Sequence, residues 1–227
     1  KRVIENGDIA VIYPEARYSL CGTNAILPES IGKLCKLFKV PVVTLIMHGH
    51  HVNAPFWNLH ERNVAPTEAE MTQLFTAKEL AEARPDAINR RINEAFRYDD
   101  YAWQKARGIK TPYEKRAEGL DKVLYQCPHC GAEYHMSSKG SQLICGACGK
   151  SWTMSEYGEL SADKGETEFS HIPDWYQWER DNVRDEVRAG KYGITCPVRV
   201  ESLPNSNGYI SLGAGTMTHD MDGFKVN

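Results

Sequence analysis

Two short apolar runs stand near the start of the chain, with a helical pattern between them. The runs cover residues 8–13 and 40–47, and each predicts a buried strand. Within residues 28–38 the apolar side chains recur at the 3.6-residue period of a helix: Ile31, Leu34, Cys35 and Phe38. A strand, a crossover helix and a second strand predict a parallel α/β sheet. Because ligands bind such sheets beyond the carboxyl ends of the strands, residues 14–19 stand at the predicted site.

The pattern continues with one more strand and several helices before a charged stretch. Residues 65–75 predict a strand, and Thr76 with Glu79 three positions later predicts a capping box at the start of a helix. The helices are expected over residues 77–83, 85–98 and 99–104. Residues 105–118 are interpreted as the linker out of a first domain.

Two groups of metal-ligand residue types fall in this part of the chain. His48, His50 and His51 share a stretch broken by glycine, and we interpret them as loop residues at the rim of a substrate pocket. A metal site there is the less favoured alternative, because adjacent side chains of a strand point apart. Asp99 and Asp100 are neighbours on a predicted helix and do not share a face, so a capping or solvated role is expected.

Composition narrows the class of protein. The 227 residues carry a formal net charge of -3, so no overall positive field attracts nucleic acid or an anionic membrane. No apolar run reaches the ~20 residues of a membrane-spanning helix. The chain has seven cysteines, an odd number, and nothing points to secretion, so a reducing compartment is expected.

Two Cys-x2-Cys-Gly motifs, separated by fourteen residues, predict a zinc ribbon. The expected ligands are Cys127, Cys130, Cys145 and Cys148. Four thiolates leave no open coordination position, so the zinc is predicted to be structural, with a redox Cys-x2-Cys pair as the alternative. A hairpin is expected over residues 132–136 and 142–144, with Trp152 covering the site. Residues 122–155 carry three lysines against one glutamate, so no nucleic-acid partner is expected.

The last part of the chain has a third character. Residues 173–189 predict a helix whose buried stripe consists of Trp175, Trp178, Val183 and Val187. Strands are expected over residues 194–201, 209–212 and 216–219, with a further one from Phe224. Turn residues at 205–208 and 220–223 predict hairpins, so we expect a small antiparallel β domain that is incomplete at its end.

Two motifs of the first segment resemble a known family. Tyr13-Pro14-Glu15-Ala16-Arg17-Tyr18-Ser19 is similar to the F-P-E-G-T-R-S block of the glycerolipid (lysophosphatidic acid type) acyltransferases. Val40-Pro41-Val42-Val43-Thr44-Leu45 resembles their later V-P-[IV]-[IV]-P-V block. The chain departs from the family pattern where Ala16 replaces a glycine, Tyr18 an arginine and Thr44 a proline. An arginine stands one position earlier, at Arg17.

The resemblance implies transfer of an acyl group from acyl-CoA or acyl-carrier protein to a lysophospholipid or glycerol-phosphate hydroxyl. Members of the family use an H-x4-D pair in which histidine removes the hydroxyl proton and aspartate orients it. None of the eight histidines here has an aspartate five residues on, and the family pair lies upstream of the Pro-Glu block. We therefore expect the pair before Lys1, and residues 1–227 alone to be inactive.

On this resemblance the chain carries the acceptor-binding half of an active site. Arg17 is the expected phosphate ligand, because guanidinium offers a planar bidentate fork. Glu15 is expected to bond an acceptor hydroxyl or to hold Arg17, and Ser19 to donate to the phosphate. The alternative for these residues is a surface turn with an ordinary ion pair. The alternative for the whole chain is a zinc-ribbon interaction protein whose α/β part is a non-catalytic scaffold.

The expected fold class is α/β in three parts. A partial parallel-sheet acyltransferase domain is expected over residues 1–112, a zinc ribbon over 113–160, and a helix with an incomplete β domain over 161–227. Donor and acceptor would be the partners, with peripheral contact to lipid. The protein is expected in the cytoplasm or at the inner face of the membrane.

Overall fold

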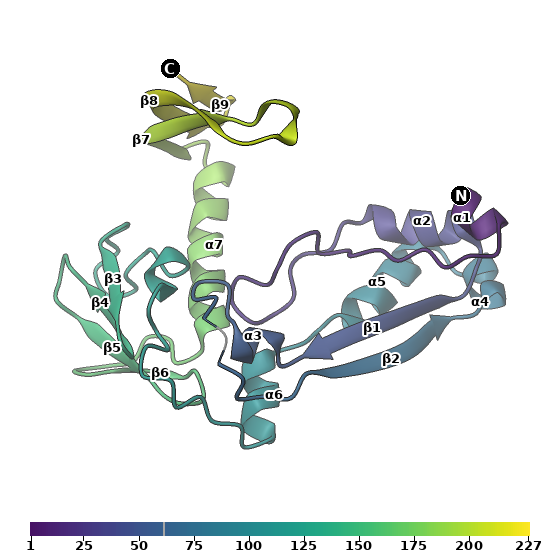
Figure 1. Ribbon diagram of the computed structural model, residues 1–227, viewed down its shortest axis with the longest axis horizontal. Helices are drawn as coiled ribbons and strands as arrows, with labels where there is room; N and C mark the ends of the chain where they lie inside the picture. Colours follow the sequence, from purple (N-terminus) through teal and green to yellow (C-terminus); the bar gives the residue numbers. More distant parts are fainter. Residues whose placement is uncertain (61) are drawn as a thin grey trace. The chain divides into compact units, whose positions relative to one another are not determined.

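The computed structural model describes residues 1–60 and 62–227, which divide into two units, Lys1–Tyr176 and Gln177–Asn227 (Figure 1). Both mix helix and sheet, and every strand pair among the described residues is antiparallel. The predicted division of the first unit at residues 112 and 113 stays a prediction. No helix within the described residues has the length and apolar character needed to cross a membrane.

The first sheet consists of β1 (Val42–His48) and β2 (Glu68–Phe75). The two strands run antiparallel, from Val42 opposite Phe75 to His48 opposite Glu68. The expected strand over residues 8–13 is wrong for the described chain, because this segment forms no regular element and pairs with no strand. Its apolar side chains are exposed, Ile9 by 87% and Tyr13 by 83%. An apolar run forms a strand only where a neighbouring edge accepts its backbone hydrogen bonds.

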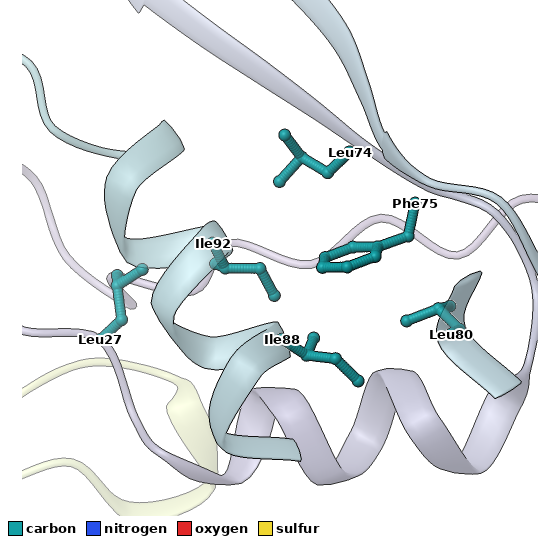
Figure 2. Close-up of a cluster of buried hydrophobic side chains, with 6 residues drawn as sticks. All are labelled: Leu27, Leu74, Phe75, Leu80, Ile88 and Ile92. Carbon is teal, nitrogen blue, oxygen red and sulfur yellow. The ribbon is translucent and has the colours of Figure 1, made fainter. Parts of the chain in front are cut away.

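Three helices pack with the end of β2 into the core of this part. They are α2 (Ser30–Phe38), α4 (Ala77–Glu82) and α5 (Pro85–Ala95). Figure 2 shows the buried cluster between them, which consists of Leu27, Leu74, Phe75, Leu80, Ile88 and Ile92. The helix predicted over residues 28–38 is confirmed, and the helix predicted to reach Tyr98 ends earlier, at Ala95.

Local polar contacts fix where these helices begin and meet. The predicted capping box is present: the N–H of Glu79 donates to Thr76 Oγ1 (3.2 Å), and the N–H of Thr76 donates to Glu79 Oε2 (2.7 Å). Asn89 ties α5 to α2, because its Oδ1 accepts from the N–H of Gly32 and its Nδ2 donates to the carbonyl of Glu29, both at 2.7 Å. These two hydrogen bonds join α5 to the start of α2, beside the apolar contacts that the helices make in the core.

Four short helices complete the first part of the unit: α1 (Arg2–Glu5), α3 (His50–Asn53), α6 (Asp100–Ala106) and the 3₁₀ turn η1 (Leu120–Lys122). Asp99 caps α6, accepting from the N–H groups of Tyr101 (2.9 Å) and Ala102 (3.0 Å), which confirms its capping role. The stretch after α6 is bonded to the cysteine-rich part. The N–H of Thr111, for example, donates to the carbonyl of Glu156 (2.8 Å).

The cysteine-rich part is a four-stranded antiparallel sheet in chain order. Its strands are β3 (Met136–Lys139), β4 (Gln142–Cys145), β5 (Ser151–Met154) and β6 (Leu160–Ala162). The predicted hairpin between the cysteine motifs is present as β3 and β4, with its first strand beginning at Met136 rather than at residue 132.

The second unit contains most of helix α7 (Ile172–Arg188) and a meander of three strands. The strands are β7 (Gly193–Ser202), β8 (Ile210–Asp220) and β9 (Gly223–Val226), with the turn η2 (Pro204–Ser206) before β8. Two strands predicted over residues 209–212 and 216–219 are one strand, β8, because it pairs with β7 throughout. The hairpin predicted at residues 220–223 is confirmed, with Asp220 opposite Gly223.

Candidate metal centre and candidate acceptor-binding loop

The four cysteines predicted as ligands lie together in the structure. Their sulfur atoms, from Cys127, Cys130, Cys145 and Cys148, all lie within 4.8 Å of one another. Sγ of Cys127 is 3.8 Å from that of Cys148, and Sγ of Cys130 is 3.8 Å from that of Cys145. A tetrahedron with metal–sulfur distances of about 2.3 Å has edges of about 3.8 Å, whereas a disulfide would bring two sulfurs to about 2.05 Å. The group can therefore hold one metal ion.

The two motifs share one backbone geometry. Gly131 and Gly149 both have a φ of 76°, and each follows the second cysteine of its motif. The N–H of Gly131 donates to the carbonyl of Cys127 (2.9 Å), and the N–H of Gly149 donates to the carbonyl of Cys145 (2.8 Å). Glycine adopts this left-handed conformation without steric cost, which explains its place in both motifs.

Backbone donors and burial act in opposite directions on the thiols. Burial raises the pKa of Cys127 to about 12 despite N–H groups of Cys130 and His129 that bond its sulfur. At Cys145 burial also raises the pKa, but N–H donors from Cys148 and Ala147 outweigh it and leave the pKa below its usual value. The two first cysteines of the motifs thus differ in the direction in which the fold shifts the thiol pKa.

Two tryptophans support the centre from the core. Trp152 and Trp175 are fully buried and meet edge to face, with 4.9 Å between ring centroids. Nε1 of Trp175 donates to the carbonyl of Gln126 (3.0 Å), the residue before Cys127. Nδ1 of His129 lies 3.3 Å from Oε1 of Glu168. Neither His129 nor His135 belongs to the metal-binding group found among the described residues.

The predicted acceptor-binding residues lie on one loop that is braced by its own polar groups. Oε2 of Glu15 accepts from the N–H of Ala25 (2.9 Å). Oγ of Ser19 accepts from the N–H of Gly22 (2.9 Å) and donates to the carbonyl of Thr23 (2.7 Å). Glu15 and Ser19 therefore hold the loop through hydrogen bonds to its own backbone.

Arg17 differs from its two neighbours. Its side chain is exposed and forms no hydrogen bond or ion pair with any residue that the structure describes. Neither the expected contact with Glu15 nor the alternative of an ordinary surface ion pair is present there. The loop turns just before it: the N–H of Ala16 donates to the carbonyl of Tyr13 (3.1 Å), and Ala16 has a φ of 54°.

Three consecutive residues at the start of α6 each hold a histidine, an arrangement that sequence reasoning missed. The contacts are Asp99 Oδ2 to His171 Nε2 (2.9 Å), Asp100 Oδ1 to His48 Nδ1 (3.1 Å) and Tyr101 Oη to His51 Nε2 (3.2 Å). His48 is the last residue of β1, and His51 is buried in α3. The expectation that the histidines lie in a loop at the rim of a pocket is therefore wrong for these two. The partners are about fifty positions apart or more, and no local spacing could reveal them.

The braced loop is connected to this histidine cluster. The N–H of Asp100 donates to the carbonyl of Gly22 (2.9 Å). Burial raises the pKa of Tyr98, and the negative charge of Glu15 raises it further, while a hydrogen bond with Ser19 opposes both. Tyr98 also meets His48 edge to face, with 6.3 Å between ring centroids. In comparisons with known proteins, no protein-family model, no curated protein and no solved structure matches the chain.

Proposed function

We propose that this chain carries the acceptor-binding half of a glycerolipid acyltransferase, joined to a structural zinc ribbon. The reaction moves an acyl group from acyl-CoA or acyl-carrier protein to the hydroxyl of a lysophospholipid or a glycerol phosphate. The observation that carries the proposal is the left-handed backbone of Ala16, φ 54°, inside the Pro-Glu turn. Acyltransferases of this family have glycine at the matching position.

A left-handed alanine costs about 1–2 kcal/mol relative to glycine, so this conformation is not adopted by default. Two contacts hold the left-handed conformation of Ala16. The N–H of Ala16 closes a turn on the carbonyl of Tyr13, and the carboxylate of Glu15 accepts from the N–H of Ala25. The loop therefore has a left-handed residue, a conformation that glycine favours, at the position where the family block has its glycine. This agreement supports the resemblance through geometry rather than through residue identity.

Arg17 is the residue of this loop that has a free charged group. An exposed guanidinium without a carboxylate partner can bind a phosphate by donating two parallel N–H···O bonds to it. Glu15 and Ser19 act as positioning residues, because their hydrogen bonds fix the turn from which Arg17 projects. On this proposal the phosphate of the acceptor binds Arg17.

On this proposal, a further segment of the domain would supply the remainder of the active site. Apolar side chains on residues 8–13 and on the sheet are uncovered: Ile9, Val11, Ile12, Tyr13, Val43, Leu45, Met47 and Met71. We propose that the other half of the domain covers them and pairs with residues 8–13, which would form the parallel sheet expected from the sequence. Its H-x4-D histidine would take the acceptor proton as the hydroxyl oxygen bonds the acyl carbon and the thiolate leaves.

The metal of the ribbon is proposed to be zinc in a structural role. Four thiolates at tetrahedral spacing suit zinc and leave no position for water or substrate. The ribbon would then stabilise the fold and take no part in acyl transfer. With an acceptor drawn from lipid, the protein would work as a cytoplasmic enzyme in peripheral contact with the inner face of the membrane.

An assay of the complete protein tests the proposal. It should transfer radiolabelled acyl groups from acyl-CoA or acyl-carrier protein to lysophosphatidic acid or glycerol 3-phosphate, and substitution of the H-x4-D histidine should abolish transfer. Residues 1–227 alone should show none, because losing a general base typically costs about 10²–10⁴-fold. A folded, metal-loaded complete protein that transfers no acyl group to any of these acceptors would favour the second candidate, an interaction protein whose α/β part is a scaffold.

A further inference from the structure

A cleft in the first unit is lined by two arginines and by no acidic residue of the described chain. It has a cavity volume of about 30 Å³, is partly open to solvent, and lies between α3, α6 and the end of β5. The residues that matter for its chemistry are Arg62, Arg116, His51, Trp57 and Tyr101. None of residues 13–19 lines it, so the cleft is separate from the loop proposed to bind the acceptor.

Arg62 is the more unusual of the two arginines. Its Nε and Nη2 atoms are buried and have no hydrogen-bond partner in the part of the chain that the structure describes. Nη1 makes only long bonds, of 3.4 Å each, to the carbonyl groups of Asn53 and Asn58. The Arg62 guanidinium faces the ring of Tyr113, 5.0 Å from the ring centroid. Burial lowers the pKa of Arg62. The Arg62 side chain is half-buried, and removing two of its N–H groups from water without a described hydrogen-bond acceptor is unfavourable unless a ligand supplies one.

Further N–H donors surround the same space. Nε1 of Trp57 is buried and likewise has no partner within the described residues. Arg116 donates through Nε to the carbonyl of Met154 (2.8 Å) and through Nη1 to the carbonyl of Tyr113 (3.3 Å), and it forms no ion pair with a described carboxylate. The two guanidinium charges are therefore not neutralised by the lining itself.

The two buried titratable groups of the cleft, His51 and Tyr101, add no charge to it. Burial, reinforced by the positive charge of Arg62, lowers the pKa of His51 to about 3, so its imidazole is neutral. The hydroxyl of Tyr101 contacts His51 Nε2 at 3.2 Å, and burial raises its pKa well above the usual value, so it is neutral as well. Among the described residues that line it, the cleft thus offers several N–H donors, two positive charges and no negative one.

We propose that this cleft binds a small oxyanion, a phosphate group either free or carried by a small molecule, through Arg62 and Arg116. Guanidinium forks match the paired oxygens of a phosphate, and the cleft is partly open to solvent, so a bound anion need not be fully enclosed. The lining joins residues of the α/β part to Met154, Ser155 and Gly158 of the ribbon, so a bound anion would tie these two parts of the unit together. The inference is independent of acyl transfer.

Calorimetry and thermal unfolding of the 227-residue protein test the site at constant ionic strength, with chloride as the reference salt. Inorganic phosphate, glycerol 3-phosphate and a short-chain lysophosphatidic acid serve as probes. Saturable binding of one of them, with a raised Tm, supports the site. Equal affinity for all three identifies the phosphate group alone as the ligand, and tighter binding of an organic phosphate identifies a phosphorylated molecule.

Two variants make the test specific. R62M should raise the Tm in anion-free buffer, because it removes two buried N–H groups that lack a described acceptor, and should weaken phosphate binding about tenfold or more. R2M is the matched control, since Arg2 is exposed and lies outside the cleft, and it should bind as the original protein does. No binding of any probe to the original protein, or full binding by R62M, would overturn the proposal. If R62M does not fold, R116Q gives the same comparison.

Discussion

Nδ1 of His48, the last residue of β1, lies 3.1 Å from Oδ1 of Asp100, the first residue of α6. The His48 ring also stacks on Trp103, one turn further along the helix, with 5.6 Å between ring centroids. Burial raises the pKa of Asp100, and the contact with His48 only partly offsets this effect. The pair therefore fixes the strand to the helix, while the charge of Asp100 itself is disfavoured by its surroundings.

The first prediction concerns this pair. His48→Ala should lower the free energy of unfolding by about 1–3 kcal/mol, because it leaves a buried carboxylate without its partner. Asp100→Asn should cost less, because the amide keeps a hydrogen bond and removes a disfavoured charge. Urea unfolding followed by tryptophan fluorescence measures both. In the double variant the Asn substitution should recover part of the loss; purely additive effects would show that the two side chains are not coupled.

The second prediction concerns pH and His51. Its pKa is about 3 in the folded chain against 6.5 when unfolded, so the folded state binds fewer protons. Stability from this residue is fully present above pH 6.5 and falls as the pH drops toward 3, by up to about 1.4 kcal/mol per pH unit. His171 contributes to stability with the opposite pH dependence, because the hydrogen bond with Asp99 raises the pKa of His171. The contribution of His171 is fully present below pH 6.5 and is lost as the pH rises.

Unfolding free energies between pH 6.5 and 4.5, in buffers free of phosphate, measure the slope. His51→Gln should flatten it, and His60→Gln, at an exposed histidine, should leave it unchanged. The same slope in His51→Gln as in the original protein would mean that another group is responsible.

The third prediction tests the turn at Ala16. Ala16→Gly should stabilise the protein by about 1 kcal/mol, because glycine adopts a φ of 54° without strain. The control is Ala102→Gly, at an exposed position inside α6, which should destabilise by about 0.5–1 kcal/mol. Thermal unfolding of the two variants separates a left-handed turn from a generic effect of glycine. Destabilisation by both substitutions would contradict the turn conformation.

The fourth prediction concerns the metal centre. Purified protein should contain one zinc per chain, and Cys127→Ala should lose the metal together with the folded sheet β3–β6. Cys196→Ala, at a cysteine of β7 outside the group, should keep the metal. Elemental analysis with circular dichroism checks both. A metal-free protein with the ribbon folded and all four thiols reactive would remove the assignment.

Sequence reasoning succeeded where one short motif determines the geometry. The spacing of Cys127, Cys130, Cys145 and Cys148 predicted a group that the structure brings together. Thr76 and Glu79 predicted a helix start for the same reason, since a capping box needs only four residues.

It failed where the partner is distant in the chain. Residues 8–13 have the apolar pattern of a strand but no neighbouring edge in the described chain. Asp100 was expected to be solvated or capping and is buried against His48, a residue 52 positions away. Residues 209–212 and 216–219 were expected as two separate strands, yet β8 continues through residues 213–215 because β7 pairs with it there.

The most direct test of the proposed function is the steady-state kinetics of Arg17 variants in the complete protein, with acceptor and donor varied separately. If Arg17 holds the acceptor phosphate, Arg17→Ala should lower kcat/KM for the acceptor roughly ten- to hundredfold and leave donor binding little changed. Arg17→Lys should also be poor, because lysine lacks the planar fork, and Arg2→Ala should behave as the original enzyme does. Unchanged acceptor kinetics in a folded Arg17→Ala protein would contradict the assignment of this loop to the acceptor.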